Sequence, residues 1–256
     1  MFSLVKNEVI KIFAGKKIYV ISVIIILANL LAWMESLVGT IDILINGQNI
    51  SLHMLGTIMN IIMPIFMIIL VGDMFTAEYV NGTLKLPLLH PVSRMKLITA
   101  KAIALIIPVF VLTIFSIIIS YLLGSIYFGW GDIFIFEDVE YSTIAGIILT
   151  INSYLISIIP VYTFSLVLMF LSMFFNSTGA FAGASFGLII LLSFFGEVIN
   201  ALKPYLIIHY FNDLFRIVFF EGDPVNIAIA FVVIPVYGLC SYLLSIYLFR
   251  KKDLLY

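Results

Sequence analysis

Six long apolar stretches, each of about 20 residues or more, dominate this sequence and limit what it can fold into. A helix needs about 20 apolar residues to cross the roughly 30 Å hydrocarbon core of a bilayer. Only 11% of the residues are charged, against about 25% in soluble domains, and 63% are hydrophobic. The sequence therefore predicts an all-α, polytopic membrane protein in which residues 1–256 form one transmembrane domain. The six predicted helices span Ile18–Val38, His53–Gly72, Ala102–Leu123, Thr143–Leu171, Gly179–Val198 and Ile227–Phe249.

The distribution of basic residues predicts the orientation of these helices. Of the 13 Lys and Arg residues, all but Lys203 and Arg216 lie before the first stretch, between the second and third, or after the last. Basic residues that flank membrane spans are retained in the cytoplasm. The loops 41–52 and 124–142, on the opposite side, contain acidic residues and no basic ones. We therefore expect a multi-pass protein of the cell membrane with both termini in the cytoplasm.

The first 15 residues differ from the spans. Phe2, Val5, Val9, Ile12 and Phe13 recur at helical spacing, while Lys6, Glu8 and Lys11 lie off that apolar face. This pattern predicts an amphipathic interface helix over residues 1–15 on the cytoplasmic leaflet. A plain basic anchor is the alternative.

Residues 199–226 are apolar and aromatic but interrupted by polar residues, among them Lys203, Asp213 and Arg216. A seventh span here would move the C-terminal basic residues outside, against the charge rule. We therefore expect a re-entrant outer segment before the last helix. It is either an amphipathic helix lying on the headgroups or a short helical hairpin that inserts among the spans.

Some residues inside the spans are polar or unusually small. Asn60 lies near the middle of the second span and is a candidate for lining a pathway or bridging helices. Glu35 and Glu197 lie near the outer ends of their spans, where a carboxylate reaches water at low cost. Gly179, Gly183 and Gly187 recur every four residues, a spacing that lets helix backbones approach closely. Their partner is either another helix of the chain or a second subunit.

Residues 73–101 form the largest predicted cytoplasmic loop. The sequence predicts a short helix around Phe75–Val80, a turn at Asn81-Gly82, and a helix stop at Pro87 and Pro91. A short helix projecting into the cytoplasm suits docking onto a soluble partner. A solvated loop that only sets the topology is the alternative.

The segment EYVNGTLKLPLLHPVSR, from Glu78 to Arg94, resembles the permease subunits of ABC-2 type exporters, including those that export bacitracin or lantibiotics. The N-terminal KNEVIKIFAGKKIYV resembles the interface helix and first span of that family. Pro87 departs from the family pattern, which leaves the end of the coupling helix in question. The resemblance implies a cytoplasmic coupling helix, within the loop 73–101, that inserts into a separate ABC ATPase subunit. The implied coupling residues are Glu78, Tyr79, Gly82, Thr83, Leu84 and Arg94.

The same resemblance implies further partners. ATP and Mg²⁺ are expected on the ATPase subunit, and this chain is expected to bind no cofactor. A second permease copy or paralogue is expected to complete the pathway, with the glycine-rich fifth span near the dimer interface. The re-entrant segment is expected to act as an extracellular gate, and the cargo to be an antimicrobial peptide or another amphipathic molecule, which would confer resistance.

Other activities find little support in the sequence. No G-x-x-x-x-G-K-[ST] motif occurs, so the chain is not itself the ATPase, and it is predicted not to be an enzyme. Cys240 is the single cysteine and the three histidines are far apart, which argues against a disulfide or a metal site. Nothing in the charge pattern indicates nucleic-acid binding. A stand-alone secondary transporter, an intramembrane enzyme and a membrane scaffold are the alternatives.

Overall fold

The computed structural model describes residues 1–37, 45–84, 92–137 and 139–251, and most of these residues are helical. Within them, six helices are long and apolar enough to cross a membrane. The prediction of an all-α protein with six transmembrane helices is therefore confirmed. The six helices span Lys17–Ser36, Ile50–Val80, Arg94–Tyr127, Thr143–Ser172, Thr178–Val198 and Pro224–Lys251.

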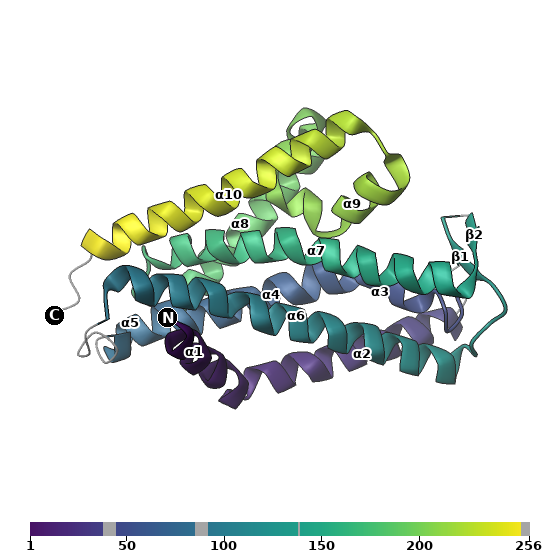
Figure 1. Cartoon of the computed structure of the whole chain (residues 1–256), viewed down its shortest axis with the longest axis horizontal. Helices are drawn as coiled ribbons and strands as arrows, with labels where there is room; N and C mark the ends of the chain where they lie inside the picture. Colours follow the sequence, from purple (N-terminus) through teal and green to yellow (C-terminus); the bar gives the residue numbers. More distant parts are fainter. Residues whose placement is uncertain (38–44, 85–91, 138, 252–256) are drawn as a thin grey trace.

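Most of the spans lie side by side along the long axis of the molecule, while the fifth and sixth lean away from the others (Figure 1). A shorter helix, α1 (Phe2–Ala14), lies at the same end as the C-terminal end of the last span. We call this end, which carries Lys11, Lys101 and Arg250, the basic end. The opposite end carries a small β-hairpin, and we call it the hairpin end. Five spans are single elements: α2 (Lys17–Leu37), α6 (Arg94–Tyr127), α7 (Thr143–Ser172), α8 (Thr178–Val198) and α10 (Pro224–Lys251).

The second span changes its helical geometry along its length. Its α-helical segments are joined by two wider, π-helical turns, η1 and η2. Pro64 has no N–H to donate to the carbonyl of Asn60, four residues earlier, which accounts for the wider turn at η1. The five elements in order are α3 (Ile50–Thr57), η1 (Ile58–Ile62), α4 (Met63–Val71), η2 (Gly72–Ala77) and α5 (Glu78–Val80).

The helices extend into the predicted loop 73–101 from both sides. Phe75–Val80 is helical as predicted, but it continues the second span without a break. The Asn81-Gly82 turn is confirmed, since Gly82 has φ 69° and its amide donates to the Tyr79 carbonyl at 3.1 Å. The predicted stop at Pro87 and Pro91 concerns residues 85–91, outside the described residues.

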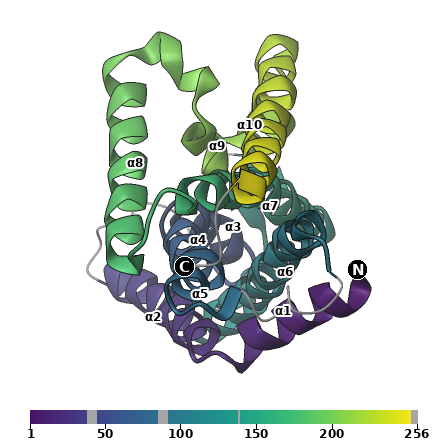
Figure 2. The same cartoon turned by 90° about the vertical axis from the view of Figure 1, so that its left-hand side faces the viewer.

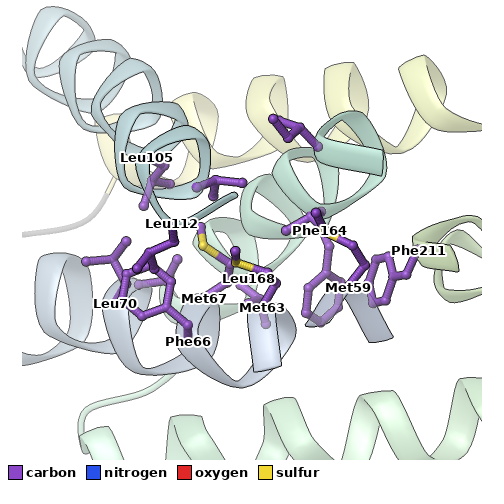
Figure 3. Packing of buried hydrophobic residues seen from close by; sticks show 14 of the residues in the cluster. Met59, Met63, Phe66, Met67, Leu70, Leu105, Leu112, Phe164, Leu168 and Phe211 are labelled. Atoms are coloured by element: carbon purple, nitrogen blue, oxygen red, sulfur yellow. The ribbon is translucent and has the colours of Figure 1, made fainter. Parts of the chain in front are cut away.

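The core of the bundle lies around α4. Met63, Phe66 and Met67 are almost completely buried, as is Met59 in η1. Figure 3 shows these side chains packing with Leu105 and Leu112 of α6 and with Phe164 and Leu168 of α7. A helix that is apolar on all sides needs neighbours on all sides. The second span is accordingly the central helix of the bundle, with 67% of its most apolar window buried.

A β-hairpin that the sequence did not predict covers the hairpin end. Strand β1 (Phe134–Phe136) pairs antiparallel with β2 (Val139–Tyr141). The Phe134 side chain is completely buried against Gly146 of α7. The side-chain amide of Asn49, just before α3, donates to the Ile135 carbonyl at 3.0 Å. The hairpin thus connects the second span with α7.

Replacing Gly146 with alanine is expected to destabilise the protein by about 1–3 kcal/mol, the usual cost of overpacking. A Cβ at this position would lie 2.3 Å from the Phe134 ring, so the ring and the hairpin would have to move. Gly238→Ala in α10 is a matched control, because its Cβ would meet Thr163 at an ordinary 3.6 Å. Thermal unfolding in detergent micelles measures both, and equal midpoints for the two variants would contradict the packing of Phe134.

Residues 199–226 form a folded hairpin, and not a helix lying along the surface. In the helix α9, Tyr210, Phe211 and Phe215 are buried, and the Phe211 ring centroid lies 5.3 Å from that of Phe164 in α7. Of the two predicted alternatives, the structure has the inserted hairpin. Its elements are the 3₁₀ turns η4 (Asn200–Tyr205) and η5 (Ile207–His209), α9 (Tyr210–Arg216) and the π-helical turn η6 (Ile217–Glu221).

Three spans lie at the periphery of the bundle. Only 28% of the most apolar window of α2, 17% of that of α8 and 22% of that of α10 is buried. Figure 2 shows α8 and α10 as two columns that rise from the bundle, with α9 between them. Around Gly183 and Gly187 of α8, no atom lies within 4 Å of where a Cβ would be placed. Among the described residues, therefore, no other helix of this chain packs against these two glycines.

Candidate functional site

A buried lysine lies at the basic end, where α1, the second span and α6 meet. Lys101, about two turns into α6, is 0% exposed. Its Nζ is 2.8 Å from Glu8 Oε2 of α1 and 2.8 Å from Glu78 Oε2 of α5. It also donates to the Met74 carbonyl at 3.0 Å. The ammonium group has three protons, so these three acceptors use its full hydrogen-bonding capacity.

Lys11 of α1 binds the other oxygen of each carboxylate. Its Nζ is 2.9 Å from Glu8 Oε1 and 3.1 Å from Glu78 Oε1. We call Glu8, Lys11, Glu78 and Lys101 the charge cluster. It has two positive and two negative charges, and each carboxylate lies between two ammonium groups. The Lys11 side chain is 51% exposed, so the charge cluster extends from the protein interior to the surface.

The electrostatics of the charge cluster favour the ionised forms of Glu8 and Lys11. Burial alone would raise the pKa of Glu8, but the ammonium groups of Lys101 and Lys11 hold that pKa below its ordinary value. Burial likewise opposes the charged form of Lys11, but the carboxylates of Glu8 and Glu78 raise its pKa. Because each charge has partners, the cost of burying it is offset. The charge cluster therefore links α1 to the second span and α6.

The predicted apolar face of α1 is confirmed at Ile12, which is buried, and at Val5, Val9 and Phe13, which pack against the core, but it is wrong at two positions. The sequence placed Glu8 off the apolar face, yet the structure buries Glu8 beside Ile12, one turn along the helix. Phe2, assigned to the apolar face, is 82% exposed. Hydrophobic spacing alone could not show that Lys101 would provide a buried partner for a carboxylate.

A second ion pair lies next to the charge cluster. The Nζ of Lys17, at the start of α2, is 2.5 Å from a carboxylate oxygen of Asp73 in η2. Both side chains are about half exposed. The first span is thus also joined by charge to the end of the second span, close to the point where α1 binds.

The predicted coupling residues divide into buried and exposed positions. Glu78 belongs to the charge cluster, Tyr79 packs partly buried against the core, and Leu84 is buried. The turn 80–83 is the accessible part, since Val80, Asn81 and Thr83 are exposed. The Thr83 hydroxyl donates to the Glu78 carbonyl at 3.3 Å, and Gly82 supplies the left-handed backbone conformation that the turn needs.

Arg94 lies at the start of α6 and contacts the end of α10. Its Nη1 donates to the carbonyls of Phe249, at 3.4 Å, and Arg250, at 3.1 Å. The last carbonyl groups of a helix have no partner within the helix and carry partial negative charge, so a guanidinium group there is favourable. Arg94 therefore connects the third and sixth spans at the basic end.

The structure places Asn60 on an exposed part of η1, where it lines a pocket together with Glu197, Lys203, His209 and Asp213. Glu197 lies in the last turn of α8, at the end of its span as expected, and this turn lies beside η1 of the second span.

The sequence did not reveal Lys101 and Glu8 as members of a buried site. Lys101 was interpreted only as a basic residue that sets the topology, and Glu8 only as part of the polar face of the N-terminal helix. A signal was present for Lys101. Its neighbours three and four residues away on α6 include Leu97, Ile98 and Leu105, all buried. A single lysine on an otherwise apolar helix face needs an acidic partner on a neighbouring element.

Comparison with known proteins identifies a family but no characterised relative. A search of curated proteins found no match. The model of a family described as "Protein of unknown function (DUF2705)" matches residues 23–255, from within α2 to beyond α10. The matched region includes Glu78 and Lys101 of the charge cluster but not α1, which holds Glu8 and Lys11. Because the match covers most of the sequence, the chain belongs to the DUF2705 family.

Proposed function

We propose that this chain is the membrane-spanning permease subunit of an ATP-driven exporter of the ABC-2 type. A separate ATPase subunit would bind ATP and Mg²⁺, and a second permease copy or paralogue would complete the pathway. The observation that carries the proposal is the charge cluster directly beneath the exposed turn 80–83. It links the segment that would contact the ATPase to α1 and α6.

The geometry supports transmission of a movement from the turn to the spans. Glu78 is at the end of the continuous second span and is bound to Lys101 of α6 and Lys11 of α1. Breaking a buried ion pair by removing one partner costs about 3–5 kcal/mol, so these three elements are expected to move together. ATP binding to the partner would favour one arrangement of the spans, and this difference in affinity would drive the change in access.

The proposal includes the orientation and the membrane. The basic end would face the cytoplasm of the cell, with both termini, because lysine and arginine residues gather there. The turn 80–83 would then be accessible to a cytoplasmic ATPase. The re-entrant hairpin would lie at the extracellular side, where it would act as a gate.

The second permease subunit is proposed to pack on α8. The open space around Gly183 and Gly187 supports this position, since small residues at this spacing let two helices approach closely. Most of α2 is likewise not covered by other parts of this chain. The cargo is proposed to be amphipathic, an antimicrobial peptide for example, because the peripheral spans present mainly apolar side chains.

Site-directed crosslinking tests the contact with the ATPase. Cys240 is the single cysteine, so Cys240→Ser gives a background without thiols. In that background we expect Thr83→Cys, carrying a photoreactive maleimide, to crosslink to an ATP-binding protein in native membranes. Glu140→Cys, exposed in β2 at the hairpin end, is the control and should not. Crosslinking from Glu140→Cys but not from Thr83→Cys would contradict the proposal.

A further inference from the structure

A polar pocket of about 170 Å³ lies between α8, the re-entrant hairpin and η1. A single water molecule requires only about 10–15 Å³ by a comparable measure, so the pocket has room for a group of several heavy atoms. Six polar side chains line it: Asn60, Ser193, Glu197, Lys203, His209 and Asp213.

The pocket lies at the C-terminal end of α8 and beside η1 of the second span. Asn60 is ten residues from Ile50, where the second span begins, which corresponds to about 15 Å along a helix. In Figure 1 the turn that follows α8 likewise falls short of the β-hairpin.

Several polar groups around the pocket have no partner among the residues that the structure describes. Asn60, Ser193 and Glu197 are exposed, and none of them makes a hydrogen bond or ion pair with another described residue. Glu197 lies in the last turn of α8, and ionisable residues within transmembrane helices commonly mark substrate pathways. Its carboxylate, unpaired among the described residues, is therefore available to bind a ligand.

The charged side chains around the pocket indicate the sign of the charge on that ligand. Asp213 already has cationic neighbours, since its Oδ2 is 2.9 Å from Nδ1 of His209 and it interacts with Lys203 and Arg216. Glu197 makes no ion pair with any described residue. A cationic ligand in the pocket would provide its counter-ion.

We propose that this pocket binds the primary ammonium group of an amphipathic cargo molecule, with Glu197 as its counter-ion. An ammonium group has three protons to donate, and Glu197, Asn60 and Ser193 offer a carboxylate, an amide oxygen and a hydroxyl oxygen. The apolar lining residues Leu192, Leu206 and Ile208 would contact the adjoining methylene groups. This assignment rests on the proposed function and deepens it by naming the class of cargo.

An organic cation fits these walls better than a metal ion. No group of three His, Cys, Asp or Glu side chains among the described residues could hold a metal. An inorganic cation would also leave the apolar part of the pocket unused. The ammonium group could belong to an aliphatic amine or to a lysine side chain or N-terminus of a peptide.

Binding of dodecylamine, which is an ammonium ion at pH 7, tests the proposal. The purified full-length chain is placed in phosphatidylcholine nanodiscs without any ATPase, and empty nanodiscs give the background partitioning. We expect saturable binding about tenfold tighter than that of dodecanol, its neutral counterpart. Because no ATPase is involved, this result is independent of whether an ATPase partner is found. A lysine-containing amphipathic peptide, with and without acetylated lysines, distinguishes the two sources of ammonium.

Two variants locate the site. Glu197→Gln keeps the shape of the side chain and should weaken dodecylamine binding about tenfold while leaving dodecanol unchanged. Ser193→Phe fills the pocket and should weaken both ligands even if Glu197→Gln folds poorly. Glu140→Gln, on the β-hairpin, should change neither. Equal affinity for dodecylamine and dodecanol, unaltered binding by folded Glu197→Gln, or displacement of dodecylamine by sodium or magnesium ions alone would overturn the proposal.

Discussion

Lys101→Met is expected to lower the free energy of unfolding by about 3–5 kcal/mol, the usual cost of removing one member of a buried ion pair. Methionine fills much of the space of lysine but leaves the carboxylates of Glu8 and Glu78 with only the half-exposed Lys11 between them. The Met74 carbonyl also loses its donor. Thermal unfolding of the purified protein in detergent micelles should show a clear fall in the midpoint.

Two comparisons separate the loss of charge from the loss of packing. Lys11→Met removes a lysine of the same charge cluster at a half-exposed position and should cost only about 0–1 kcal/mol. Adding Glu8→Gln and Glu78→Gln to Lys101→Met removes the uncompensated charges and should recover much of the stability. If Lys101→Met were no less stable than Lys11→Met, Lys101 would not be the central ion of the charge cluster.

Glu78→Gln is expected to reduce export by about 5- to 150-fold, the usual range of coupling between two sites, while ATP hydrolysis by the partner continues. The variant keeps the size of the side chain but removes the charge that binds α5 to Lys101 and Lys11. Movement of the turn 80–83 would then no longer be passed fully to α1 and α6. Reconstituted vesicles that contain both subunits allow hydrolysis and export to be measured on one sample.

The control for this experiment is Glu140→Gln, an equivalent change at the hairpin end. It should alter neither hydrolysis nor export. Parallel loss of hydrolysis and export by Glu78→Gln would indicate that the ATPase no longer binds. Normal export by Glu78→Gln would show that coupling does not pass through the charge cluster.

The spans could be predicted from hydrophobicity. Their ends were predicted least accurately where charged residues lie within the helix. The third span was expected to begin at Ala102 because Lys96 and Lys101 appeared to belong to a loop. The helix in fact begins at Arg94, because two distant carboxylates neutralise Lys101 and allow it to be buried. Lys101 is 93 positions from Glu8 and 23 positions from Glu78 in the sequence. Ion pairs over such separations leave no periodic signal in the sequence.

The β-hairpin and the polar pocket escaped prediction for a related reason. Each strand has three residues, and the hairpin is held by contacts such as Asn49 with Ile135, 86 positions along the chain. Glu197 was predicted at the end of its span, but hydrophobicity could not show that it shares a pocket with Asn60 and the re-entrant hairpin. The inserted hairpin itself was one of two predicted alternatives, and burial of its aromatic residues against α7 decides between them.

The most direct test of the proposed role in ATP-driven export is to purify the tagged protein from native membranes in mild detergent and identify what accompanies it by mass spectrometry. We predict that an ATP-binding subunit is recovered in near-equal amount from the unaltered protein. Repeated recovery of the intact, folded chain without such a subunit would contradict that role and would favour a self-sufficient transporter or a scaffold.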